Sequence, residues 1–169
     1  MREKRLYLLR HTQACKACKT CIDFETPLTK NGRKQAQQVG FYLKKHACHP
    51  ELVFCSKAKR CIDTLSIIKK DMPPAPVVYH HFLYLASGYT VLEMLNFIGD
   101  DIDDVLVVGH SQAICQLPVL LLPDVRHIDK RLNRAYPCGT LICLSFPFSS
   151  PHWRDVLCHQ MKIDDIFYP

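Results

Sequence analysis

The sequence predicts an α/β fold with a mostly parallel central sheet. Short apolar segments alternate with amphipathic segments along the 169 residues, the pattern of strands alternating with helices. Residues 105–108 are apolar throughout, as expected for a strand buried on both faces. The closing segments, residues 140–146 and 153–161, are read as neighbouring antiparallel strands. We therefore expect a mixed sheet with one antiparallel edge.

Length and composition indicate one globular domain spanning residues 1–169. The chain is 48% hydrophobic and 22% charged, and its net charge of +6 mildly favours anionic partners. It lacks the long basic runs typical of nucleic-acid tails, so we expect no nucleic-acid partner. The apolar run after the basic N-terminus is too short for a signal peptide, and residues 117–123 are too short to span a bilayer. We expect a cytoplasmic protein without a membrane partner.

The first third of the chain predicts a strand, a long loop and a helix. Residues 5–9 form an apolar strand, and residues 12–27 show no periodicity, so they predict a loop. Thr29 has the residue type of a helix N-cap, and apolar residues at helical spacing continue to about Lys45. Pro50 separates this helix from a buried strand at residues 52–55.

The rest of the chain continues this alternation. Ser56 is predicted to cap a second helix, and residues 76–79, flanked by prolines, predict an edge strand. A helix is expected over residues 90–98. Ser111 is predicted to cap a helix towards Leu122 that Pro118 kinks or divides.

Two predicted strands run directly into histidines. Residues 5–9 lead into Arg10 and His11, and residues 104–109 lead into His110. Arg60 lies in the first turns of the second helix, close to another strand end. Ligands bind in the crevice outside the carboxyl ends of strands in open α/β sheets. We therefore expect Arg10, His11, Arg60 and His110 to meet around one phosphoryl group.

These residue types suit phosphoryl transfer. Arginine offers a planar fork to phosphate oxygens, and histidine, with an ordinary pKa of about 6.5, is either neutral or charged near neutral pH. A neutral His11 could attack phosphorus through one ring nitrogen while the other nitrogen binds a backbone carbonyl. A protonated His110 could stabilise the equatorial oxygens. We also assign substrate binding to Thr12, Ser111 and Gln112, the last two at a helix N-terminus that favours anions.

Four sequence blocks together resemble a known family. They are the Leu9-Arg10-His11 start, Leu28-Thr29-x-x-Gly32, Ser56-x-x-x-Arg60-x-x-x-Thr64 and Val108-Gly109-His110. Their order and spacing resemble the histidine phosphatase, or phosphoglycerate mutase-like, superfamily over roughly residues 6–144. Within it, the short chain is most similar to the SixA-type phosphohistidine phosphatases.

The resemblance implies a mechanism and a fold. His11 becomes the nucleophile that forms a phosphohistidine intermediate, and Arg10, Arg60 and His110 become the phosphate pocket. The implied fold is a three-layer α/β/α sandwich, with no metal or organic cofactor. The chain departs from many members at Thr12, where they carry glycine.

A second departure concerns the proton donor. Residues 79–89 contain no Asp or Glu, whereas larger members carry an acidic donor after the third strand. A protonated imidazole leaves phosphorus more easily than an alkoxide, so a phosphohistidine substrate needs less acid catalysis. Asp23 or Glu25, in the loop after His11, could nevertheless reach the site.

The predicted substrate is a phosphorylated protein carrying phosphohistidine, and three alternatives stay open. A small phosphate ester could be hydrolysed on the same fold, or the chain could bind phosphoproteins without turnover. The Cys15-x-x-Cys18-x-x-Cys21 spacing could hold zinc or respond to redox conditions, although a fourth ligand is not evident. A basic cluster following the His110 helix could border the pocket or could be a solvated face; it comprises Arg126, Lys130, Arg131 and Arg134.

Overall fold

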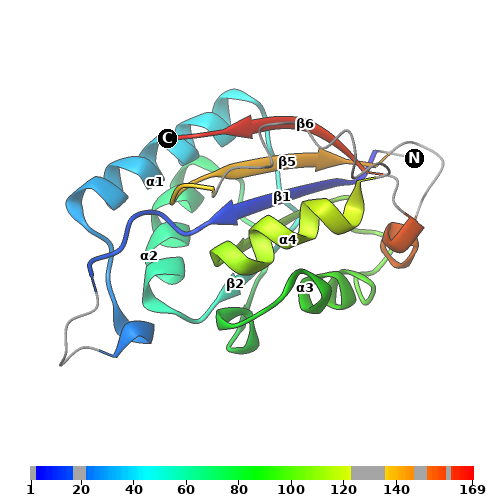
Figure 1. Ribbon diagram of the computed structural model, residues 1–169. Helices are drawn as coiled ribbons and strands as arrows, with labels where there is room; N and C mark the ends of the chain where they lie inside the picture. Colours follow the sequence, from blue (N-terminus) through cyan, green and yellow to red (C-terminus); the bar gives the residue numbers. More distant parts are fainter. Residues whose placement is uncertain (1–2, 17–21, 123–135, 147–151, 159–160) are drawn as a thin grey trace.

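The computed structural model describes residues 3–16, 22–122, 136–146, 152–158 and 161–169. Its central sheet has six strands in the order β3-β2-β4-β1-β5-β6 (Figure 1). The strands are β1 (Arg5–Arg10), β2 (Leu52–Ser56), β3 (Val77–His80), β4 (Asp104–Gly109), β5 (Leu141–Ser145) and β6 (Lys162–Phe167). The helices are α1 (Lys30–Lys45), α2 (Lys59–Ile68), α3 (Gly88–Leu95) and α4 (Ser111–Leu121). Short 3-10 turns include η1 (Asp23–Glu25), η2 (Lys69–Asp71), η3 (Phe82–Tyr84) and η5 (Trp153–Cys158).

The sheet is mixed and mostly parallel, as predicted. Strand β1 pairs in parallel with β4, which pairs in parallel with β2, and β2 with β3. Strand β5 runs antiparallel to both β1 and β6. The parallel strands therefore end at one common edge, and the proline-flanked β3 is an edge strand, as expected.

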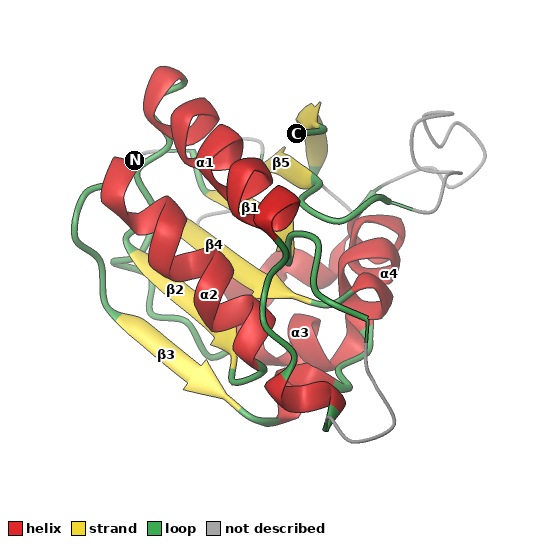
Figure 2. Ribbon diagram, turned by 90° about the vertical axis from the view of Figure 1, so that its left-hand side faces the viewer, coloured by secondary structure: helices red, strands yellow, loops and turns green. Residues whose placement is uncertain are grey.

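Helices cover both faces of this sheet, which confirms the three-layer arrangement. Alternate residues of β1 point to opposite faces, as strand geometry requires. Leu6 and Leu8 pack in a core cluster with residues of α3 and α4. Tyr7 and Leu9 pack in the other cluster, with residues of α1 and α2. Figure 2 looks onto α1 and α2 in front of the sheet.

The start of α1 follows the prediction. The Thr29 hydroxyl accepts a hydrogen bond from the Gly32 N–H at 2.9 Å, so Thr29 is the N-cap. A Cβ atom on Gly32 would lie 2.0 Å from the Gln13 carbonyl oxygen. Glycine is therefore needed here because the helix approaches the backbone that follows His11.

Several element boundaries differ from expectation. Helix α3 begins at Gly88, because the Ser87 hydroxyl accepts the Thr90 N–H and caps the helix there. A Cβ atom on Gly88 would lie 2.8 Å from the Gln116 Cβ atom, so the missing side chain lets α3 pack closely against α4. Ser111 is the first residue of α4 and His110 is the cap. Pro118 lies inside α4, which is one helix rather than two pieces.

The expected strand at residues 153–161 is wrong. Trp153 is fully buried in a 3-10 turn, and its indole N–H donates to the Ile102 carbonyl oxygen at 2.7 Å. The partner of β5 is instead β6, which begins after Met161. Burial of the indole overrides the extended pattern of this segment.

Four of the described cysteines are core residues. Cys48, Cys55, Cys61 and Cys143 are buried free thiols. Within the described residues, none of the helices is both long and apolar enough to cross a bilayer.

Replacing Gly32 with alanine should lower the free energy of unfolding by about 1–3 kcal/mol, because the new methyl group overlaps the Gln13 backbone. Gly40→Ala in the same helix is the matched control. Its Cβ would meet the end of the Asp71 side chain at 2.7 Å, which can move away. Urea unfolding of both variants measures the difference, and equal effects would contradict the proposed close approach.

Candidate active site

The register of two parallel strands places His11 beside His110. Arg10 pairs with Gly109 at the ends of β1 and β4, and each histidine follows directly. The His11 N–H donates to the Gly109 carbonyl oxygen at 3.0 Å. The two imidazole centroids are 5.2 Å apart, in an edge-to-face arrangement. The two histidines, distant in sequence, thus meet at the carboxyl edge of the sheet.

His11 is held in one orientation by the neighbouring backbone. Its Nδ1 lies 2.8 Å from the carbonyl oxygen of Thr12. A carbonyl only accepts, so the Nδ1 proton donates and the Nε2 lone pair is free to act as acceptor or nucleophile. This agrees with the predicted carbonyl contact.

Arg60 contacts both histidines from the first turn of α2. Its Nε donates to His11 Nε2 at 3.3 Å, and its Nη2 lies 3.4 Å from His110 Nδ1. The arginine is only 8% exposed. A planar guanidinium in this place offers two adjacent donors to an oxyanion between the rings.

Arg10 lies beside the same group of residues. Its Nη1 donates to the Tyr136 carbonyl oxygen. Its buried Nε has no hydrogen-bond partner among the residues that the structure describes. The positive charge of Arg10 lowers the pKa of both His11 and His110. Arg10, His11, Arg60 and His110 are called the four-residue cluster below.

Burial keeps both histidines neutral. Desolvation, followed by the charges of Arg60 and Arg10, lowers the pKa of His11 to about 4, against the opposing bond to Thr12. Burial first, then His11 and Arg60, lowers the pKa of His110 to about 3. A neutral His11 is the form needed for attack. His110 is neutral in this structure, whereas we expected it to act in its protonated form; burial, His11 and Arg60 outweigh the opposing charge of Asp23.

Ser56 orients His110 instead of capping α2. Ala58 occupies the N-cap position of α2 without a side-chain hydrogen bond, and the Ser56 hydroxyl accepts the Ala58 N–H at 3.3 Å. The same hydroxyl lies 2.9 Å from His110 Nε2. Arginine can only donate, so the contact of Arg60 Nη2 with Nδ1 requires a lone pair on Nδ1. The ring proton of His110 is therefore on Nε2, where it donates to the Ser56 hydroxyl.

Of the three residues predicted to bind substrate, Thr12 follows His11, whereas Ser111 and Gln112 follow His110. Thr12 is fully buried, and both its N–H and its hydroxyl contact the Thr64 hydroxyl, at 3.2 and 3.1 Å. Ser111 and Gln112 form the start of α4, next to His110. The Ser111 hydroxyl lies 3.6 Å from Cys115 Sγ. Their contact with substrate stays a prediction.

An acidic residue does reach the cluster from the loop after His11. The Asp23 carboxylate accepts from Arg60 Nη2 at 3.0 Å and from the Tyr84 hydroxyl at 2.5 Å. These two contacts, the Tyr84 bond being the larger cause, lower the pKa of Asp23. Asp23 is therefore a carboxylate at neutral pH and a poor proton donor. Glu25, the other residue we considered, is exposed.

Sequence reasoning gave no role at the site to Tyr84 or Thr64, and gave Ser56 only the role of a helix cap. Thr64 lies four residues after Arg60 and donates to its carbonyl oxygen at 2.7 Å, so helical spacing could have identified it. Tyr84 carried no signal, because it meets Asp23 only through the fold.

The structure assembles no metal site within its described residues, where no group of three or more His, Cys, Asp or Glu could hold an ion. Cys15 is exposed, whereas Cys18 and Cys21 lie outside the described residues, so the zinc alternative stays open. The basic cluster of Arg126, Lys130, Arg131 and Arg134 also lies outside them.

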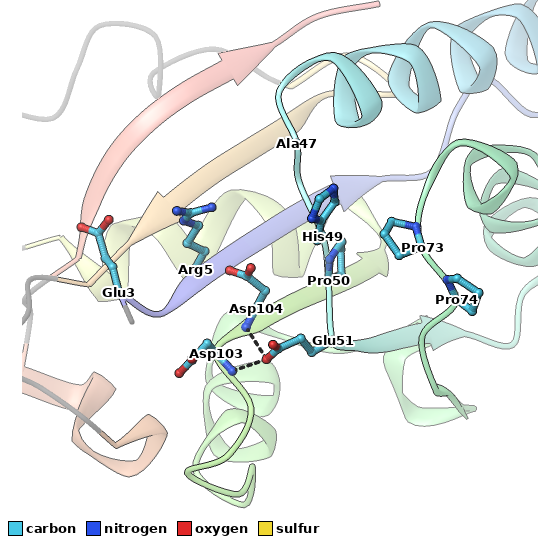
Figure 3. A pocket seen from close by; sticks show the side chains of 10 residues that line it. All are labelled: Glu3, Arg5, Ala47, His49, Pro50, Glu51, Pro73, Pro74, Asp103 and Asp104. Carbon is cyan, nitrogen blue, oxygen red and sulfur yellow. Dashed lines mark hydrogen bonds between the residues drawn. The ribbon is translucent and has the colours of Figure 1, made fainter. Parts of the chain in front are cut away.

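A separate cavity of about 600 Å³ lies at the opposite, amino end of the sheet (Figure 3). Its charged groups contact one another or the backbone. The Glu51 carboxylate accepts the Asp103 and Asp104 N–H groups at 2.6 and 3.4 Å, and Arg5 is close enough to Asp104 for their charges to interact. This cavity has no part in the four-residue cluster.

Comparison with known proteins identifies relatives. The profile of the histidine phosphatase superfamily (branch 1) matches residues 6–83. An uncharacterized protein of Mycobacterium tuberculosis is 30% identical over 137 residues, which cover 79% of this chain and 83% of the relative. An uncharacterized protein of Mycobacterium leprae is 27% identical over 125 residues, covering 73% and 76%.

Solved structures share the whole fold. A protein of Nakamurella multipartitia, provisionally assigned as the phosphohistidine phosphatase SixA, is 26% identical with a TM-score of 0.87 over 100% of this chain and 98% of that one. The corresponding Agrobacterium tumefaciens protein is 23% identical with a TM-score of 0.83, both chains being covered completely. From its sequence relatives, its fold and its paired histidines, this chain belongs to the histidine phosphatase superfamily, branch 1.

Proposed function

We propose that this chain is a phosphatase that works through phospho-His11 and removes phosphate from histidine side chains of proteins. The observation that supports it is the contact of Arg60 with both imidazoles, which brings His11 Nε2, His110 Nδ1 and a guanidinium together around one point. The proposal also draws on similar structures, one of which is a protein histidine phosphatase SixA complexed with tungstate, 17% identical with a TM-score of 0.76.

The first step transfers the phosphoryl group to His11. The lone pair of Nε2 attacks phosphorus while the proton stays on Nδ1 and keeps its hydrogen bond to the Thr12 carbonyl oxygen. The phosphorus–nitrogen bond of the substrate breaks, and its imidazole leaves as a neutral ring if it was protonated beforehand. The Arg60 Nε–H, which points at His11 Nε2 in this structure, turns to a phosphoryl oxygen. The guanidiniums of Arg10 and Arg60 stabilise the charge on the oxygens beside His110.

The second step hydrolyses the intermediate. Water attacks phosphorus, the bond to Nε2 breaks, and phosphate leaves with His11 neutral again. The lowered pKa of His11 favours this return to the neutral ring, because no proton is retained at neutral pH.

The proton chemistry favours phosphohistidine over phosphate esters. An alkoxide leaving group requires a general acid, whereas a protonated imidazole does not. The carboxyl group that contacts the cluster, Asp23, is ionised through its bonds to Tyr84 and Arg60. The site therefore suits a leaving group that brings its own proton.

His11→Ala should abolish turnover of a phosphohistidine protein, by about 10³-fold or more, and should abolish acid-labile phosphate on the enzyme, because the nucleophile is lost. Exposed His49, at the opposite end of the sheet, gives the control His49→Ala, which should retain activity. Near-normal turnover by His11→Ala would contradict the mechanism.

The substrate class is tested by parallel assays with a phosphohistidine protein and a panel of sugar phosphates. We expect a clear preference for phosphohistidine in kcat/KM. Faster hydrolysis of a sugar phosphate would favour the phosphomonoesterase alternative. Vanadate binding without release of product from either substrate would favour a non-enzymatic phosphoprotein-binding module.

His11 should stay neutral well below pH 6.5, because its pKa is lowered to about 4 by burial. Nitrogen-15 NMR of the ring should show a proton on Nδ1 and none on Nε2 at pH 5.5, with the signals assigned through His11→Ala. Since the folded pKa lies below the ordinary value, the stability that His11 provides above pH 6.5 is lost as the pH falls towards 4. A midpoint near 6.5 would refute the buried neutral ring.

A further inference from the structure

The guanidinium of Arg60 is held along two different edges. The edge formed by Nε and Nη2 faces the histidines, with His11 Nε2 at 3.3 Å and His110 Nδ1 at 3.4 Å. The outer edge, formed by Nη1 and Nη2, faces Asp23. Nη1 donates to the Asp23 carbonyl oxygen at 2.7 Å, and Nη2 donates to its carboxylate at 3.0 Å. Asp23 thus occupies the donors that point away from the histidines.

Tyr84, in η3, makes a second contact with the Asp23 carboxylate. Its hydroxyl donates to the same Asp23 oxygen that accepts from Arg60, at 2.5 Å. Its ring lies 5.6 Å from the Arg60 Cζ atom and 5.3 Å, edge to face, from the His110 ring. Phe24 packs against Tyr84 at a centroid distance of 5.1 Å. Turns η1 and η3 are therefore joined across Arg60.

We propose that Asp23 and Tyr84 are positioning residues that clamp the outer edge of Arg60, so that its inner edge is presented to the phosphoryl group. This inference rests on the proposed function. A free arginine side chain has many rotamers, and fixing one of them before binding reduces the entropy lost on binding the anion. The clamp needs a carboxylate-shaped acceptor at Asp23 and a hydroxyl donor at Tyr84.

The clamp differs from acid catalysis in what it requires of Asp23. A proton donor needs a carboxyl group that holds a proton, which asparagine cannot supply. A clamp needs an acceptor oxygen in the place of Oδ2, and the amide oxygen of asparagine provides it. Asp23→Asn therefore separates the two roles, because it keeps the contacts and removes the proton chemistry.

The experiment measures vanadate affinity and kcat/KM for Asp23→Ala, Asp23→Asn and Tyr84→Phe. Asp23→Ala should weaken vanadate binding and lower kcat/KM by about tenfold, because a charge-assisted hydrogen bond is lost. Asp23→Asn should stay within about threefold of the natural chain, the cost of a weaker neutral acceptor. Tyr84→Phe should fall between them. Glu25→Ala removes a charge from the same turn and should change neither quantity.

A double-mutant cycle shows whether the effect passes through Arg60. In an Arg60→Ala background, adding Asp23→Ala should cause no further loss, because the residue that the clamp positions is absent. A further tenfold loss in that background would overturn the proposal. Equal losses in Asp23→Asn and Asp23→Ala would also overturn it, in favour of acid–base chemistry.

Vanadate binding separates this inference from the proposed function. A chain that binds vanadate with the expected pattern but hydrolyses no phosphohistidine would contradict the proposed function and support the clamp. A chain that hydrolyses phosphohistidine with unchanged affinity in Asp23→Ala would support the function and overturn the clamp. Far-ultraviolet circular dichroism of each variant confirms that it is folded.

Discussion

The candidate site depends on the parallel register of β1 and β4. Pairing of Arg10 with Gly109 places His11 and His110 at the same level of the sheet edge. A shift by one residue would turn every side chain of β1 to the other face, so that Leu6 and Leu8 would exchange places with Tyr7 and Leu9. The packing of β1 on both faces therefore fixes the relative positions of His11 and His110. Leu6 and Leu8 pack on one face, and Tyr7 and Leu9 pack on the other.

Burial of the two histidines also determines their charge. Two imidazoles and two guanidiniums share a largely buried space, so the rings stay neutral while the arginines keep their charge. This arrangement suits the proposed function, in which an uncharged His11 attacks an anionic phosphoryl group. Backbone and hydroxyl contacts from Thr12 and Ser56 then fix which nitrogen of each ring is available. Electrostatics and hydrogen bonding therefore support the same chemical assignment.

The sequence predicted the features that local pattern controls. Apolar runs ending in Arg10-His11 and Gly109-His110 located both strands, and Thr29 located the start of α1. The expected strand at Trp153 failed because burial of one indole against Ile102 is a tertiary effect. The role of Tyr84 was missed for a similar reason, since its hydroxyl meets a residue 61 positions away. Ser56 has the residue type of a helix cap, but its hydroxyl contacts His110 instead.

The proposed mechanism requires His11 Nε2 to receive the phosphoryl group within the four-residue cluster. A crystal structure of the protein with orthovanadate measures this most directly. We expect vanadium bonded to His11 Nε2, with its oxygens contacting Arg10, Arg60 and His110. Vanadate bound elsewhere, or bound in the cluster without a bond to His11, would contradict the account.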